Sequence, residues 1–197
     1  MATFFTKTGG ANPFEPKRTF RWVVSFDNVG TDATFMAKSA KKPSFAMADT
    51  EHSFLNHVFK FPTKVKWEDI SVTFIDSFQA DIGSKFYNLL RNMGYAQPEG
   101  IDEALIGVTK AGAVNALGSI RLMQLDGGIA ASADPANTAD PDFLAANIRE
   151  EWVLKNAFIK GVKWGDTLDY TNDGLIEVSV DLTYDYATYT KKNEPYF

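Results

Sequence analysis

The sequence predicts a mainly β protein, an antiparallel β-sandwich or partial barrel with one α-helix. Two observations carry this prediction. Apolar and polar residues alternate along several short segments, as they do in strands with one buried face. Residues that favour turns separate these segments, for example at 28–30 and 126–128. A chain of 197 residues suits one domain with a core of its own.

The composition excludes several classes of protein. A net charge of -5 and a pI of about 5.1 argue against nucleic-acid binding by charge attraction, which needs clustered Lys and Arg. The absence of cysteine excludes disulfide frameworks and thiolate metal sites. The N-terminus does not resemble a signal peptide, and no apolar run approaches the ~20 residues of a spanning helix. We therefore expect no membrane segment.

The first quarter of the chain is expected to hold an arm and two strands. Residues 1–18 are rich in Gly, Pro and Thr and are predicted to form an extended arm, either a frayed end or a segment that clasps a partner. Phe14 is the candidate contact residue in this arm. A strand at 19–27 places Trp22 and Phe26 on one face. A second strand is expected at 33–39, ended by Pro43.

Residues 49–61 are predicted to form a strand that is apolar on both faces and is broken by Pro62. Such a strand must be covered on both sides. It either twists through the core of the monomer or is buried between subunits. The candidate contact residues between subunits or rings are Phe54, Leu55, Phe59 and Phe61.

The chain then changes period after a strand at 65–76. Apolar residues at helical spacing predict one helix over 82–93, with Ser77 or Asp81 as N-cap and Gly94 at its C-terminal end. Residues 97–116 are expected to be mostly loop.

The last third is predicted to contain the clearest strands. Strands are expected at 119–125 and 151–160, with an acidic surface loop over 129–147 between them and a short tail at 191–197. Residues 175–186 alternate throughout, with Ile176, Val178, Val180, Leu182, Tyr184 and Tyr186 predicted to point inward. On the opposite face lie the acids Glu177, Asp181 and Asp185.

No pattern predicts catalysis or metal binding. His52 and His57 are five residues apart on the expected strand, so they should point to opposite faces and cannot share a metal. Residues 169–174 resemble the start of an EF-hand loop, but its twelfth position is Val180, which favours a simple turn. We predict no catalytic residue, no cofactor and no metal ligand.

The acidic row of Glu177, Asp181 and Asp185 has two interpretations. Acids four apart on a strand are about 13 Å apart, too far for a glycosidase pair. The row is then either a solvated face or a wall that faces an aqueous channel.

Several segments together resemble the tail-tube proteins of contractile-tailed bacteriophages. The resemblance rests on 151–160, a short stretch to Asp169, and the closing strand at 175–186. Residues 121–126, the strand at 20–26, 38–43, and 64–75 followed by a helix keep the family's order. The resemblance covers most of 19–189, while the N-terminal arm and the acidic insert depart from simple members of the family.

The resemblance implies a structural role. Subunits would form hexameric rings, with neighbouring sheets joined edge to edge into a ring-wide β-barrel. Stacked rings would form a tube inside a contractile sheath, and the tube would conduct DNA into the host. The expected partners are other copies of the chain, the sheath, baseplate, tail-terminator and tape-measure proteins, and DNA in passage. The protein would reside in the phage tail after assembly in the host cytoplasm.

In this interpretation the domain spans 19–190 and Glu177, Asp181 and Asp185 are the candidates for lining the lumen. Ring stacking would use the arm, residues 49–63 and the loop after Gly128. Two other classes of protein stay open. One is a related ring protein, such as a tube-initiating baseplate protein or a secretion-system tube protein. The other is a β-sandwich that binds a small ligand or glycan through Trp164, Tyr170 and Tyr189.

Overall fold

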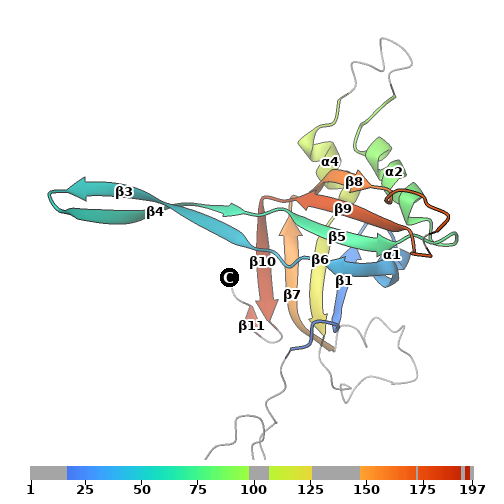
Figure 1. The fold of residues 1–197 in the computed structure, drawn as a ribbon, viewed down its shortest axis with the longest axis horizontal. Helices are drawn as coiled ribbons and strands as arrows, with labels where there is room; N and C mark the ends of the chain where they lie inside the picture. The colour runs from blue at the N-terminus through green and yellow to red at the C-terminus, as the bar shows by residue number, and fades with distance from the viewer. Residues whose placement is uncertain (1–16, 98–106, 126–146, 172, 192–193, 196–197) are drawn as a thin grey trace, which may run out of the picture.

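The computed structural model describes residues 17–97, 107–125, 147–171, 173–191 and 194–195. Phe14, most of the N-terminal arm, nearly all of the acidic loop and most of the C-terminal tail lie outside these residues. The described part is mainly antiparallel β structure, arranged as two packed sheets and a projecting hairpin (Figure 1). The predicted fold class is therefore confirmed.

The first sheet has five strands in the order β1-β6-β7-β10-β11. Their bounds are Trp22–Phe26 for β1, Ile120–Leu125 for β6, Ile148–Lys155 for β7, Tyr186–Lys191 for β10 and Glu194–Pro195 for β11. The second sheet has four strands in the order β2-β5-β9-β8. Their bounds are Ala37–Ala40 for β2, Ile70–Ile75 for β5, Glu177–Thr183 for β9 and Phe158–Lys163 for β8.

The core lies between the two sheets, whose strands run across one another in Figure 1. Every second residue of β5 and β9 is buried, including Phe74 and Val180, which are both fully inaccessible. The facing strands contribute Val24, Leu122 and Leu154. This alternation confirms the period-two pattern that the sequence shows in these segments.

Helix α2, Ile82–Asn92, closes one end of the sandwich by burying Ile82, Phe86 and Leu89. The side chain of Asp81 accepts a hydrogen bond from the Ser84 amide, and Gly94 follows the helix with a φ of 102°. Both end signals predicted for this helix are confirmed.

Two short helices were not predicted. Helix α1, Thr31–Met36, occupies most of the expected strand at 33–39, so only Ala37–Ala40 is extended. Helix α4, Lys110–Leu117, lies within the expected loop and buries Ala113 and Leu117. Its N-cap, Thr109, accepts a hydrogen bond from the Gly112 amide at 3.1 Å. Both helices are too short to show a clear apolar period in the sequence. Their helical conformation therefore depends on tertiary packing.

The chain crosses between the sheets at two corners that the sequence did not reveal. Strands β7 and β8 are separated by Asn156 and Ala157, with Asn156 at a φ of 55°. Strands β9 and β10 are separated by Tyr184 and Asp185. The expected single strands at 151–160 and 175–186 are therefore each two strands in different sheets. Ile176 precedes β9 and Tyr186 follows the corner, so both are about half exposed and not inward.

Candidate assembly surfaces

The most unusual surface is the hairpin formed by β3, Phe45–Phe54, and β4, His57–Trp67. It extends away from both sheets (Figure 1), and nearly all its residues are exposed. The expectation of one strand over 49–61 is wrong, because Leu55 and Asn56 form a tight turn with Leu55 at a φ of 53°. Pro62 does not break the structure either, since it lies in β4 at a bulge in the strand pairing.

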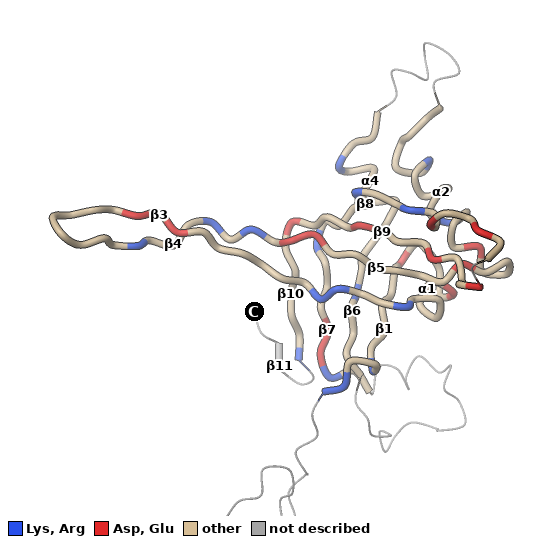
Figure 2. Tube along the Cα trace, in the orientation of Figure 1, with Lys and Arg blue, Asp and Glu red and all other residues tan. Residues whose placement is uncertain are grey.

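Because the hairpin is exposed, this segment does not pass through the core of the monomer, which was one of the two alternatives. Its solvent-facing side chains include Phe54, Leu55, Phe59 and Phe61, which are 61%, 86%, 51% and 56% exposed. Clustered exposed apolar residues of this size mark interaction sites in soluble proteins. Figure 2 shows no charged position at the tip, where residues 52–59 contain no Lys, Arg, Asp or Glu.

The outer half of the hairpin has two unlike faces. Directly paired residues share a face, and the face alternates from one pair to the next. One face carries the pairs Phe54–His57, His52–Phe59 and Thr50–Phe61, and we name it the aromatic face. The other face carries Ser53–Val58 and Glu51–Lys60, where Lys60 Nζ lies 3.2 Å from the Glu51 carboxylate and 3.3 Å from that of Asp49.

The prediction that His52 and His57 point to opposite faces is wrong. The turn at 55–56 lies between them, so they sit on different strands as diagonal neighbours on the aromatic face. Within the described ranges no group of three or more metal-ligating side chains could hold a metal ion.

A groove is lined by residues of the first sheet and of β2, the edge strand of the second sheet. Its volume is about 470 Å³, and we name it the Trp groove. Its floor contains Trp22, Leu122 and Trp152, from β1, β6 and β7. The other lining residues include Lys17, Arg18, Lys38, Ser39, Lys42, Gln124 and Glu150.

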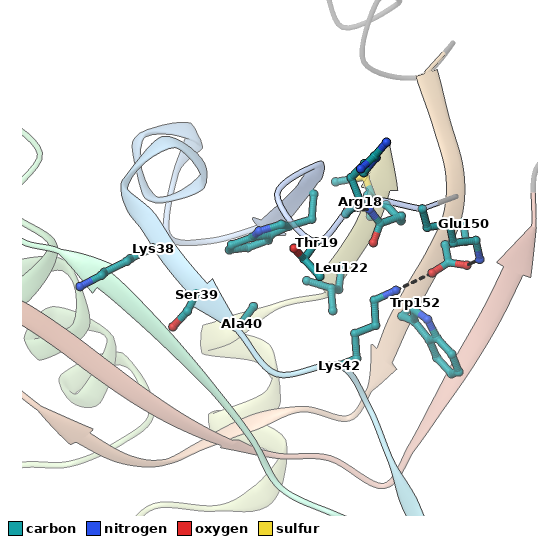
Figure 3. A pocket seen from close by; sticks show the side chains of 13 residues that line it. Arg18, Thr19, Lys38, Ser39, Ala40, Lys42, Leu122, Glu150 and Trp152 are labelled. Carbon is teal, nitrogen blue, oxygen red and sulfur yellow. Dashed lines mark hydrogen bonds and ion pairs between the residues drawn. The ribbon is translucent and has the colours of Figure 1, made fainter. Parts of the chain in front are cut away.

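Glu150 is the polar centre of this groove. It is 5% exposed and accepts hydrogen bonds from Lys17, from Lys42 at 2.6 Å and from the Tyr189 hydroxyl at 3.0 Å. Figure 3 shows Lys42 reaching this carboxylate beside Trp152. Burial would raise the pKa of Glu150, but these hydrogen bonds outweigh it and hold the pKa below its ordinary value. Glu150 therefore ties the segments just before β1 and β3 to the first sheet.

The outer face of the second sheet is polar. Ser71, Thr73 and Ser179 lie on its central strands and Ser39 on the edge strand β2, and the Thr73 and Ser179 hydroxyls are 3.3 Å apart. Glu177 forms an ion pair with Lys38. Asp69, just before β5, forms an ion pair with Lys160 at 2.6 Å, and hydrogen bonds from Lys160 and Thr183 lower its pKa. This face carries paired charges instead of an uninterrupted acidic row.

The three acids predicted as one row occupy two places. Glu177 and Asp181 lie on the outer face of β9. Asp185 lies at the corner after β9, where it contacts Lys110 Nζ at 2.7 Å and Asn156 Nδ2 at 2.8 Å. Its amide also donates to the Lys155 carbonyl at 3.1 Å. Asp185 thus joins the two chain corners to α4, and hydrogen bonds from Lys110 and Asn156 lower its pKa.

The aromatic residues predicted for ligand binding do not converge. Trp164 donates to the Gly83 carbonyl at 3.2 Å beside α2. Tyr170 is fully exposed, whereas Tyr189 packs on Trp152 with ring centroids 4.7 Å apart. Asp169 accepts hydrogen bonds from the amide and hydroxyl of Thr171, both at 2.9 Å, which makes a local turn instead of a calcium loop.

The arrangement of two crossing sheets, with α2 at one end and the hairpin at the other, is shared with chains from contractile injection systems. One similar chain comes from the six-fold symmetrised baseplate of the anti-feeding prophage (AFP). It is 12% identical with a TM-score of 0.59, and the match covers 92% of this chain and 99% of that one. Another, from the sheath/tube terminator of the extracellular contractile injection system PVC, is 15% identical with a TM-score of 0.58, covering 90% and 98%.

A third similar chain comes from the AFP tube-terminating cap. It is 15% identical with a TM-score of 0.52, and the match covers 97% of this chain and 99% of that one. No family model matches the sequence. No curated protein matches it either. These comparisons confirm the predicted resemblance at the level of the fold. No helix within the described ranges is long and apolar enough to cross a membrane.

Proposed function

We propose that this protein is a structural subunit, not an enzyme, that assembles into stacked hexameric rings forming the hollow inner tube of a contractile tail. The observation that carries the proposal is the hairpin β3–β4, whose apolar side chains have no cover within the described chain. The same assignment is supported by the fold that this chain shares with one chain of a six-fold symmetrised baseplate and one chain of a sheath/tube terminator.

Ring closure in this proposal uses the free edges of the second sheet. Strands β2 and β8 are its outermost strands. An exposed strand edge has unpaired amide and carbonyl groups, and joining β2 of one copy to β8 of the next removes these edges. Six four-stranded sheets would then form a continuous barrel around a lumen, with each subunit contributing one domain over 19–190.

The lumen wall would then be the polar outer face of the second sheet. Glu177 and Asp181 lie on this face, whereas Asp185 lies at its border. The hydroxyls and paired charges of this face would attract a transported polymer only weakly. DNA, or a tape-measure protein before it, would pass along this wall. The outer surface and the tube ends would meet sheath, baseplate and terminator proteins in a phage tail assembled in the host cytoplasm.

Electron microscopy of the purified protein tests the proposal. We expect rings or hollow tubes from the wild type. Phe59→Asp should abolish them while leaving the melting temperature nearly unchanged, because Phe59 is 51% exposed in the monomer. Ser53→Asp is the matched control, since it adds the same charge to the opposite face of the hairpin. A collapse in melting temperature for Phe59→Asp, or tubes formed by this variant, would contradict the assignment.

A second candidate is a ring that begins or ends the tube. The similarity to chains from a baseplate and from a sheath/tube terminator favours it. Such a protein would form single rings and not polymerise by itself. Long tubes from purified protein, without any template, would exclude this role; single rings that cap or nucleate tubes would support it. Tubes would be equally expected of a secretion-system tube protein, and sheath binding would distinguish a tail tube.

A further inference from the structure

We propose that Glu150 is an anchor shared by two segments of the chain, and that either segment can detach from it without releasing the other. The first segment is 17–21, which leads into β1, and the second is 41–44, which leads into β3. The inference goes beyond the proposed function, because it concerns how a single subunit holds two parts of its own chain.

Both segments contact the carboxylate of Glu150, but they use different oxygens. Lys17 Nζ donates to Oε2, and Lys42 Nζ donates to Oε1 at 2.6 Å. Figure 3 shows the Lys42 side chain directed toward this carboxylate from the second segment. The hydroxyl of Tyr189, on β10, also donates to Oε2 at 3.0 Å. Because each lysine has its own acceptor, the bond made by one does not depend on the position of the other.

The acid and the two cations differ in burial. The side chain of Glu150 is 6% exposed, whereas those of Lys17 and Lys42 are 62% and 50% exposed. A lysine that leaves the carboxylate is taken up by water, so its departure costs little. The carboxylate has no such alternative, and a buried charge that loses its partners is strongly destabilising. Glu150 therefore requires a cation, whereas neither lysine requires Glu150.

One ammonium group is enough to balance the charge of Glu150. Burial would raise the pKa of this carboxyl, but its hydrogen bonds outweigh burial, so the side chain is ionised at neutral pH. Two ammonium groups beside one carboxylate leave a surplus positive charge and repel each other. Loss of Lys17 or of Lys42 removes this repulsion, which strengthens the pair that stays. Loss of both removes the two cations that offset the burial of the acid.

Each segment also has contacts that the other does not share. The side chain of Gln124, which is 6% exposed, donates to the Arg18 carbonyl of the first segment at 2.8 Å. In the second segment, the Ser44 carbonyl accepts a hydrogen bond from the Glu68 amide at 2.9 Å. Displacement of one segment therefore leaves these contacts of the other segment in place.

In the proposed ring stacking, the shared anchor separates two movements. A partner that draws the first segment away leaves Lys42 on Glu150, so the hairpin keeps its attachment to the first sheet. Release of both segments at once would leave the buried carboxylate without either cation, so it is strongly disfavoured. This consequence rests on the proposed function, whereas the anchor itself is a property of the subunit.

A double-mutant cycle tests the shared anchor by urea unfolding of the full chain. Methionine removes the charge of a lysine and keeps a similar length. We expect Lys17→Met and Lys42→Met each to raise the equilibrium constant for unfolding by less than about tenfold. The double variant should raise it at least about tenfold more than the product of the two single effects. Additive effects would overturn the inference, because they would show that the lysines do not replace each other.

The matched control combines Lys17→Met with Lys160→Met. Lys160 pairs at 2.6 Å with Asp69, whose side chain is 42% exposed, so this acid does not depend on its cation in the same way. The two effects should multiply to within about twofold. A control pair that couples as strongly as Lys17→Met/Lys42→Met would overturn the assignment to Glu150.

The same cycle in a Glu150→Gln background separates the anchor from a general loss of packing. A neutral amide requires no cation, so the coupling between the two lysine positions should shrink to within about twofold. Coupling that persists without the carboxylate would overturn the inference. If Lys17→Met/Lys42→Met is too unstable to fold while both single variants fold, it should fold again with Glu150→Gln, and failure there would also overturn the inference.

Hydrogen exchange read by mass spectrometry tests whether the segments detach separately. Lys17→Met should speed exchange in 17–21 by about fivefold or more and leave 41–47 within about twofold of the wild type. Lys42→Met should do the reverse. Faster exchange in both segments of either single variant would overturn the inference. All these measurements use a concentration at which sedimentation shows the single subunit, so a protein that never forms rings or tubes would contradict the proposed function alone.

Discussion

The hairpin β3–β4 and the pair of strands β5 and β9 use similar apolar residues but treat them in opposite ways. Phe74 on β5 is fully buried, while Phe54 on β3 is 61% exposed. The strands β5 and β9 are covered by the first sheet and α2, whereas no described element covers the hairpin. Apolar residues indicate extended structure in both regions, but their pattern does not say what covers the strands, and it did not reveal the turn at Leu55.

The largest expected effect comes from making the same substitution in both regions. Phe74→Ala should reduce the free energy of unfolding by about 3–5 kcal/mol, because it leaves a cavity among Phe26, Phe86 and the sheet residues. Phe54→Ala should change it by no more than about 0.5 kcal/mol. Urea unfolding of both variants measures this contrast. Similar losses in the two variants would remove the distinction between core and hairpin.

The next effect concerns the segment that leads into the hairpin, which Glu150 holds against the first sheet through Lys42. Glu150→Gln should lower the free energy of unfolding by about 1–3 kcal/mol, because a buried carboxylate loses charge-assisted bonds to Lys17 and Lys42. The folded state lowers the pKa of Glu150, so the wild-type advantage should be complete above pH ~5 and disappear as the pH falls below ~4. Unfolding curves from pH 3 to 7 check this, with Glu151→Gln as control. An advantage that persists at pH 3 would contradict the assigned cause.

The smallest effect is expected at the corner between the sheets. Asp185→Asn removes the ion pair with Lys110, and because both groups are exposed the melting temperature should fall less than in Glu150→Gln. The folded state lowers the pKa of Asp185, so the difference should be present at neutral pH and vanish in acid. Thermal melts with and without 1 M NaCl measure it. Altered assembly without any change in melting temperature would instead support the lumen role predicted for Asp185.

Much of the fold could be predicted because it follows from local chemistry. Asp81 and Gly94 mark the ends of α2, and the alternation of 177–183 marks β9. The predicted strands were wrong where the chain changes direction without a glycine in the sequence. Leu55 and Asn156 occupy the left-handed region that glycine usually takes, so the turn before β4 and the corner before β8 were not anticipated.

The sequence by itself determined the mainly β class, the positions of most strands and the helix at 82–92, because period, caps and turn residues act over a few neighbours. Only the tertiary structure decided that 45–67 is a projecting hairpin whose two histidines share one face. The same holds for Glu150, which accepts hydrogen bonds from Lys17 and Lys42. These features depend on which strands pair and where the chain changes sheet. Such choices rest on contacts between residues far apart in the chain, which no local pattern records.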